Sequence, residues 1–121
     1  MLIDSNIIIY STQPAFQSLR NFLGKQNQLT VSVISKIETL GYHQLSSKQK
    51  SLLESFFSEV NLIALDDEIV DRAIRLRQTK NIPVADAIIA ATALINKLTL
   101  VTRNTSDFKA IAGLKVLNPL A

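Results

Sequence analysis

Short apolar runs alternate along the chain with longer stretches in which apolar residues recur every three or four positions. Five short runs predict buried strands, at residues 2–3, 29–33, 62–65, 99–102 and 115–117. Phe16, Leu19, Phe22 and Leu23 follow helical spacing and predict a helix over residues 15–25. The nearly all-apolar stretch 84–98, preceded by Pro83, predicts a buried helix, and residues 107–112 predict a short one.

Polar residues that favour helix N-termini mark the starts of three further helices. Ser35 is predicted to cap a helix running to residue 45, and Ser46 with Gln49 has the spacing of a capping box. Asp66 is predicted to cap a helix with Ile69 and Ala73 on one face. Strands separated by helices predict an α/β fold, a single domain over residues 1–121. It has three α/β/α layers around a mostly parallel sheet.

Composition narrows the classes of function. The chain has 121 residues with no cysteine, which excludes thiolate metal sites, thiol catalysis and disulfides. It shows no signal peptide, and no apolar run reaches the ~18 residues of a membrane span. We therefore expect a soluble, cytoplasmic protein with no membrane partner. The formal net charge of +3 adds little, because such a value is ordinary for a domain of this size.

Three acidic residues occupy unusual surroundings. Asp4 lies between apolar runs at the end of the first strand, where a charge is costly unless it is paired, bound to metal or used as a helix cap. Glu38 shares a predicted helical stripe with Ile34 and Ile37, although a stripe-edge carboxylate often reaches solvent. Asp86 is the only charge between Lys80 and Lys97, and its ordinary role would be to accept free N–H groups at a helix start.

Asp107 is a fourth acidic candidate, with a turn or cap as its ordinary role. Thr102, Asn104 and Asp107 all lie at or beyond the end of the fourth strand. Ligands bind beyond the carboxyl ends of strands in such sheets, so we expect these residues to meet Asp4 there. Carboxylates brought together would raise each other's pKa, and a divalent cation would relieve their repulsion. Oxygen ligands alone favour Mg²⁺ or Mn²⁺ over zinc.

Other catalytic chemistries have weaker support. His43 is the single histidine and is more simply a structural residue late in a helix. The chain has no G-x-S-x-G elbow and no glycine-rich phosphate loop. Lys36, Arg103 and Lys109 lie near acidic positions in the sequence. Contact with substrate phosphates is one interpretation of these residues, and solvated surface charge is the simpler one for each.

Four segments together resemble the PIN-domain family, and within it the VapC-type toxins of bacterial toxin–antitoxin pairs. They are Leu-Ile-Asp-Ser-Asn at residues 2–6, the strand and Glu-bearing helix at 31–41, Ile-Pro-Val-Ala-Asp-Ala at 82–87, and Thr-Leu-Val-Thr-Arg-Asn at 99–104 with Asp-Phe at 107–108. The resemblance covers essentially the whole chain, in order and with matching spacing.

The resemblance implies a metal-dependent endoribonuclease that acts on RNA, is usually a homodimer and is held inactive by a cognate antitoxin. Asp4, Glu38 and Asp86 match its three core acids, and Asp107 is assigned as the fourth. Asn6, Thr102 and Asn104 are expected as polar support. A DNA-directed or structure-specific nuclease, and a non-catalytic interaction module, remain alternatives.

Overall fold

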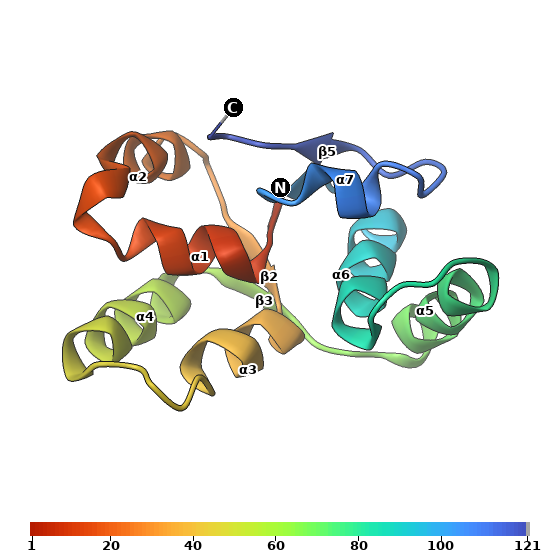
Figure 1. Cartoon of the computed structure of the whole chain (residues 1–121), viewed down its shortest axis with the longest axis horizontal. Coiled ribbons are helices and arrows are strands. Elements are labelled where there is room, and N and C mark those ends of the chain that lie inside the picture. Colours follow the sequence, from red (N-terminus) through yellow and green to blue (C-terminus); the bar gives the residue numbers. More distant parts are fainter. Residues whose placement is uncertain (121) are drawn as a thin grey trace.

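The computed structural model describes residues 1–120 and contains a five-stranded sheet surrounded by helices (Figure 1). The strands are β1 (Leu2–Ile3), β2 (Thr30–Ser32), β3 (Asn61–Ile63), β4 (Leu100–Val101) and β5 (Val116–Leu117). The α-helices are α1 (Ser5–Ser11), α2 (Gln17–Gly24), α3 (Val33–Leu40), α4 (Ser47–Glu59), α5 (Asp67–Thr79), α6 (Val84–Ile95) and α7 (Thr105–Phe108). A 3₁₀ turn, η1 (Pro14–Phe16), precedes α2.

The sheet has the order β3-β2-β1-β4-β5, and every neighbouring pair is parallel. β1 lies at its centre between β2 and β4, and these three strands are fully buried. This arrangement confirms the predicted α/β architecture. All carboxyl ends of the strands therefore face the same edge of the sheet, so residues that follow β1, β2 and β4 become neighbours.

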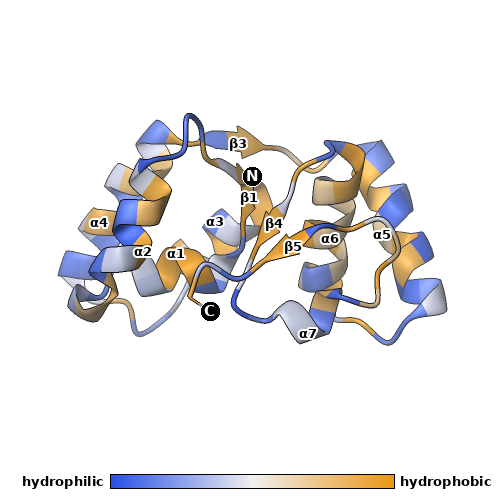
Figure 2. Ribbon diagram, turned by 90° about the horizontal axis from the view of Figure 1, so that it is seen from above, coloured by the Kyte–Doolittle hydropathy of each residue, from blue (hydrophilic) through white to orange (hydrophobic). Residues whose placement is uncertain are grey.

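Two hydrophobic cores lie on opposite faces of the sheet, because successive strand residues point in opposite directions. Leu2 and Leu100 enter the core formed with α5, α6 and α7, whereas Ile3 and Val101 enter the core formed with α1, α2 and α4. Helix α3 contributes to both cores. Figure 2 shows the central strands as mostly hydrophobic segments between the two groups of helices. The structure is thus a three-layer sandwich, as predicted.

The predicted helix starts are right at two positions and wrong at one. Ser46 forms the capping box with Gln49, and Asp66 caps α5 by accepting from the Ile69 N–H. The start of α3 differs, because Ser32 is its N-cap and accepts from the Ile34 N–H. Ser35 instead lies buried inside the helix. The serine at the end of the strand takes the capping role, which leaves β2 shorter than predicted.

Helix α1 was not predicted. Its isoleucine run is typical of a strand, but Ile7 and Ile8 are fully buried in the core beside α2 and α4, and that packing outweighs local preference. Other boundaries also shift: the stretch 15–25 divides into η1 and α2, and the helix predicted over 84–98 ends at Ile95. The helix predicted over 107–112 is α7, at residues 105–108. Among the described residues, no helix is long and apolar enough to cross a membrane.

Replacement of the α3 cap should cost stability. We expect Ser32→Ala to lower the free energy of unfolding by about 1 kcal/mol, because the Ile34 N–H loses its side-chain acceptor. Urea denaturation measures this change. Ser51→Ala, at an exposed position inside α4, is the matched control and should change stability by less than about 0.5 kcal/mol. Equal effects of the two substitutions would show that Ser32 is not the cap.

Candidate metal centre

The register between β1 and β4 places Asp4 beside Thr102. Leu2 pairs with Leu100 and Ile3 with Val101, so the next residue of each strand emerges at the same edge. The Asp4 N–H donates to the Val101 carbonyl at 2.9 Å, which extends this pairing beyond the strands. The Thr102 hydroxyl donates to Asp4 Oδ2 at 2.7 Å. Two segments 98 residues apart are thereby joined at the predicted site.

Asp4 is a buried carboxylate, with 6% of its surface exposed. It caps α1 by accepting from the Ser5 N–H at 2.8 Å, so its ordinary role as a helix cap is real. Burial raises the pKa of Asp4, while the hydrogen bonds from Thr102 and Ser5 act in the opposite direction. The charges of Glu38 and Asp107 raise it further. Asp4 is therefore both a cap and a member of a crowded acidic group.

Asn6 links α1 to the loop after β4. Its side-chain nitrogen lies 3.4 Å from both Asp4 Oδ2 and Thr102 Oγ1, and its oxygen accepts from the Arg103 N–H at 3.3 Å. The Thr102 hydroxyl oxygen also accepts from the Asn104 N–H at 3.1 Å. Asn6 and Thr102 thus hold the Asp4 carboxylate and the loop in one orientation. Asn104 contributes its backbone, while its side chain is on the exposed part of the loop.

Glu38 belongs to α3 and is exposed, but its carboxylate is held by serines that the sequence analysis did not assign to the site. Ser5 Oγ lies 2.7 Å from Glu38 Oε1 and 2.9 Å from Ser35 Oγ. Because a hydroxyl has one proton, Ser5 donates to Glu38 and accepts from Ser35. The signal was available, since Ser35 precedes Glu38 by one helical turn and Ser5 follows Asp4 directly.

Asp86 lies in the first turn of α6, whose N-cap is Pro83. Its expected ordinary role as an acceptor for helix N–H groups is absent, because its side chain accepts no hydrogen bond from residues 1–120. Partial burial raises the pKa of Asp86 to about 6, with further contributions from the charges of Asp4, Asp107 and Glu38. Burial and the neighbouring negative charges therefore both disfavour the charged form of Asp86.

Asp107 lies in α7 and is exposed. Its negative charge raises the pKa of both Asp4 and Asp86, so it is close to them in space. The turn that carries it is closed by the Asp107 N–H, which donates to the Asn104 carbonyl at 3.1 Å. The charges of Glu38 and Asp107 therefore both act on Asp4 and on Asp86.

The donors available at this edge fit a hard divalent cation. They are carboxylate, hydroxyl and amide oxygens, and no basic side chain lowers the pKa of Asp4 or Asp86. The four carboxylates share a neighbourhood without forming a closed coordination sphere. Within residues 1–120, no three acidic or histidine side chains are already placed to hold a metal ion. Binding would therefore require side-chain rotation toward a common point.

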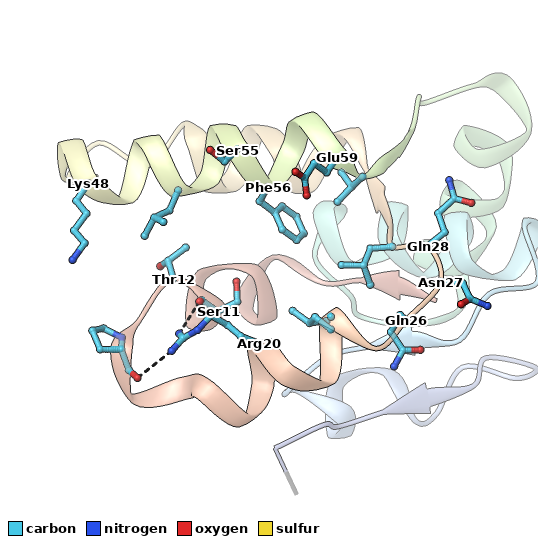
Figure 3. A pocket seen from close by; sticks show the side chains of 16 residues that line it. Ser11, Thr12, Arg20, Gln26, Asn27, Gln28, Lys48, Ser55, Phe56 and Glu59 are labelled. Carbon is cyan, nitrogen blue, oxygen red and sulfur yellow. Dashed lines mark hydrogen bonds between the residues drawn. The ribbon is translucent and has the colours of Figure 1, made fainter.

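A hollow of about 640 Å³ lies elsewhere, between α2 and α4 (Figure 3). Phe56, Leu52 and Leu23 form much of its wall, and Arg20 ties the turn before α2 to the carbonyls of Ser11 and Gln13. None of the four acidic candidates lines it. The acidic edge, and not this hollow, therefore remains the candidate site.

Comparison with known proteins gives a consistent result. The family model described as "PIN domain" matches residues 1–114. The chain is 25% identical to the tRNA(fMet)-specific endonuclease VapC of Shigella flexneri, over 94% of this chain and 93% of that protein.

Solved structures agree with this comparison. A toxin–antitoxin complex from Klebsiella pneumoniae contains a chain 33% identical to this one, with a TM-score of 0.78 and coverage of 98% and 96%. VapBC2 from Rickettsia felis, bound to a promoter DNA fragment, matches at 26% identity with a TM-score of 0.85 and coverage of 97% and 96%.

The raised pKa of Asp86 predicts that removal of its charge stabilises the metal-free protein. With a folded pKa of about 6 against 3.8 for an unperturbed group, ionisation disfavours the folded state as pH rises through this interval. We expect Asp86→Asn to raise the free energy of unfolding at pH 7 by about 1 kcal/mol in EDTA, after allowance for solvent screening. The gain should disappear below about pH 4.

Denaturant unfolding at several pH values measures this difference. The exposed Asp71 of α5 supplies the control, because Asp71→Asn removes the same charge away from the acidic group. That variant should stay within about 0.5 kcal/mol of wild type. A loss of stability in Asp86→Asn at neutral pH would mean that its carboxylate is well accommodated and not crowded.

Proposed function

The chain belongs to the PIN domain family, and we propose that it is a metal-dependent endoribonuclease, the toxin of a toxin–antitoxin pair. The observation that supports this proposal is electrostatic: the charges of Glu38 and Asp107 raise the pKa of both Asp4 and Asp86, which lie at the carboxyl edge of the sheet and at the start of α6. Like charges that act on one another destabilise the fold, and a capping role accounts for Asp4 alone among the four carboxylates. A site for a cation explains them.

Asp4 and Asp86 are the proposed direct ligands of the ion, because they are the more buried acids. Glu38 and Asp107 would complete the site directly or through water. The oxygen-only donor set favours Mg²⁺ or Mn²⁺. Such an ion acidifies a water molecule and neutralises charge on the phosphoryl oxygens, which is the chemistry that phosphodiester hydrolysis requires.

The chain's own residues would orient these ligands. The Thr102 hydroxyl fixes one oxygen of Asp4 and the Ser5 N–H fixes the other, so this carboxylate has a single orientation. Ser5, whose hydroxyl is also bonded to Ser35, donates to Glu38, which lies exposed on α3. Hydrogen bonds of this kind around ligands are a common requirement of metal sites.

The proposed partners follow from the same relatives. The curated relative is named as an endonuclease specific for a tRNA, and the solved structures are complexes of toxins with antitoxins. We propose RNA as the substrate, a cognate antitoxin as the inhibitor and a homodimer as the active form. The cytoplasm is the proposed location, because RNA is available there.

Loss of either central acid should abolish cleavage. We expect Asp4→Asn and Asp86→Asn to reduce Mg²⁺- or Mn²⁺-dependent cleavage of RNA by at least about 100-fold, because both changes weaken the hold on the ion. The assay compares RNA, single-stranded DNA and flap substrates. Circular dichroism confirms that the variants fold, and Asp71→Asn should retain full activity.

Chelation gives an independent check. EDTA should stop cleavage by the wild-type protein, and added Mn²⁺ should restore it. Wild-type activity that persists in EDTA, or full activity in Asp86→Asn, would rule out the metal-dependent mechanism. Cleavage of DNA but not of RNA would be consistent with the metal-dependent mechanism and would contradict RNA as the substrate.

Expression in bacteria tests the toxin role. Induction of the wild-type chain alone should arrest growth, because free RNA is cut without an inhibitor. Asp86→Asn should be tolerated at the same protein level, as judged by immunoblotting. Equal arrest by both proteins would mean that toxicity does not come from the nuclease site.

A further inference from the structure

Arg103 directly follows Thr102 in the loop between β4 and α7, and its side chain is ordered by an aromatic ring. The guanidinium carbon lies 4.8 Å from the centre of the Tyr10 ring. The backbone of the same residue is fixed separately, since its N–H donates to the Asn6 oxygen. Both interactions come from α1, on which Asn6 and Tyr10 are four residues apart and so share a face. Arg103 is therefore held at two points.

The ring beneath Arg103 is itself fixed. Tyr10 packs against Phe16 of η1, with ring centres 5.0 Å apart and an interplanar angle of 35°. The turn between α1 and η1 is tied by Arg20, which donates to the carbonyls of Ser11 and Gln13. Phe16 thus packs against the Tyr10 ring on which the Arg103 guanidinium lies, and Arg20 holds the turn between α1 and η1.

The donors of this guanidinium remain available. Stacking on a ring face attracts the cation without occupying its five N–H groups. In the described part of the chain, no carbonyl, hydroxyl or carboxylate accepts a hydrogen bond from the Arg103 side chain, and the residue is exposed. A purely structural arginine resembles Arg20, whose guanidinium has four acceptors. Arg103 differs from Arg20, because its guanidinium is held against a ring while its N–H groups have no acceptor among the described residues.

We propose that Arg103, positioned by Tyr10, binds a backbone phosphate of the RNA next to the one that is cut. The inference rests on the proposed nuclease function and adds to it a substrate-binding residue. Guanidinium groups bind phosphate through two parallel hydrogen bonds, which a lysine does not reproduce. The carboxylates at the edge of the sheet repel a phosphodiester. Arg103 lies over Tyr10, about one helical turn, or ~6 Å, along α1 from Asn6. Its positive charge at that place offsets the repulsion and aligns the RNA strand.

The decisive experiment measures salt dependence. Binding of a short fluorescent single-stranded RNA is followed by anisotropy in Mg²⁺, with Asp86→Asn as the background to prevent cleavage. Removing one ionic interaction with a phosphate of a single strand reduces the slope of log K against log salt by about 0.7. We expect Arg103→Ala to reduce the slope by about 0.7 and to weaken binding about 3- to 10-fold at low salt. Arg103→Lys should recover part of the affinity.

A matched removal of charge shows whether the effect is local. Lys115 is exposed just before β5, at the opposite edge of the parallel sheet from the acidic site. Lys115→Ala removes one positive charge and should leave the slope unchanged. Equal slopes for Arg103→Ala and the background protein, or equal reductions for Arg103→Ala and Lys115→Ala, would overturn the proposal.

The role of Tyr10 is tested by a pair of substitutions. Tyr10→Phe keeps the ring face and should bind RNA as wild type does, whereas Tyr10→Leu should weaken binding in the same direction as Arg103→Ala. Combining Tyr10→Leu with Arg103→Ala should weaken binding no further, because both changes remove one interaction. Additive effects would contradict positioning by the ring.

Kinetics of the otherwise wild-type enzyme separate this inference from the nuclease function. Arg103→Ala should raise KM about 3- to 10-fold and change kcat little, because the bound phosphate lies outside the reacting one. If the wild-type protein cleaves RNA and Arg103→Ala has the same KM, the role of Arg103 is refuted and the nuclease function is not. A wild-type protein that neither binds nor cleaves RNA would refute both proposals.

Discussion

A carboxylate at the end of a buried strand must be hydrogen-bonded or paired, and the environment of Asp4 shows how this protein meets that requirement. The parallel register of β1 and β4 places the Thr102 hydroxyl 2.7 Å from one carboxylate oxygen, and the first N–H of α1 satisfies the other. Desolvation still raises the pKa of Asp4, so these bonds compensate burial only in part. The rest of the edge is arranged around this residue: Asn6 joins it to the loop after β4, and Ser5 connects it to Glu38.

The acidic edge is separate from the hydrophobic cores. The cores on either side of the sheet are apolar, and none of the four carboxylates belongs to them. Asp86 in particular accepts no hydrogen bond from the described residues and has a pKa raised to about 6. Sites that bind ions or substrates often carry such a cost in stability, since their groups are arranged for the ligand. Arg103 is likewise arranged for a ligand, because Tyr10 orders its side chain while the guanidinium N–H groups remain available.

Much of the fold follows from local pattern, and the failures have physical causes. The alternation of short apolar runs with helical stretches predicted the parallel sheet and the two helical layers. Helix α1 was missed because its isoleucines favour strands locally, while tertiary burial of Ile7 and Ile8 decides the outcome. Ser35 was taken for a cap because serine favours that position, yet Ser32 stands where the strand ends and takes the role. Asp4 and Asp86 stand out in the sequence by their apolar neighbours, and Asp107 by its place after the fourth strand, whereas the interactions of Ser5, Ser35 and Tyr10 depend on segments that only the folded chain brings together.

The central claim is that the four carboxylates hold a divalent cation, and calorimetric titration of the metal-free protein with Mn²⁺ tests it most directly. We predict saturable, stoichiometric binding by the wild-type protein and an affinity at least about tenfold lower in Asp86→Asn, because one ligand becomes neutral. Titration heats no larger than dilution for the wild-type protein, or identical binding by the two proteins, would contradict this claim.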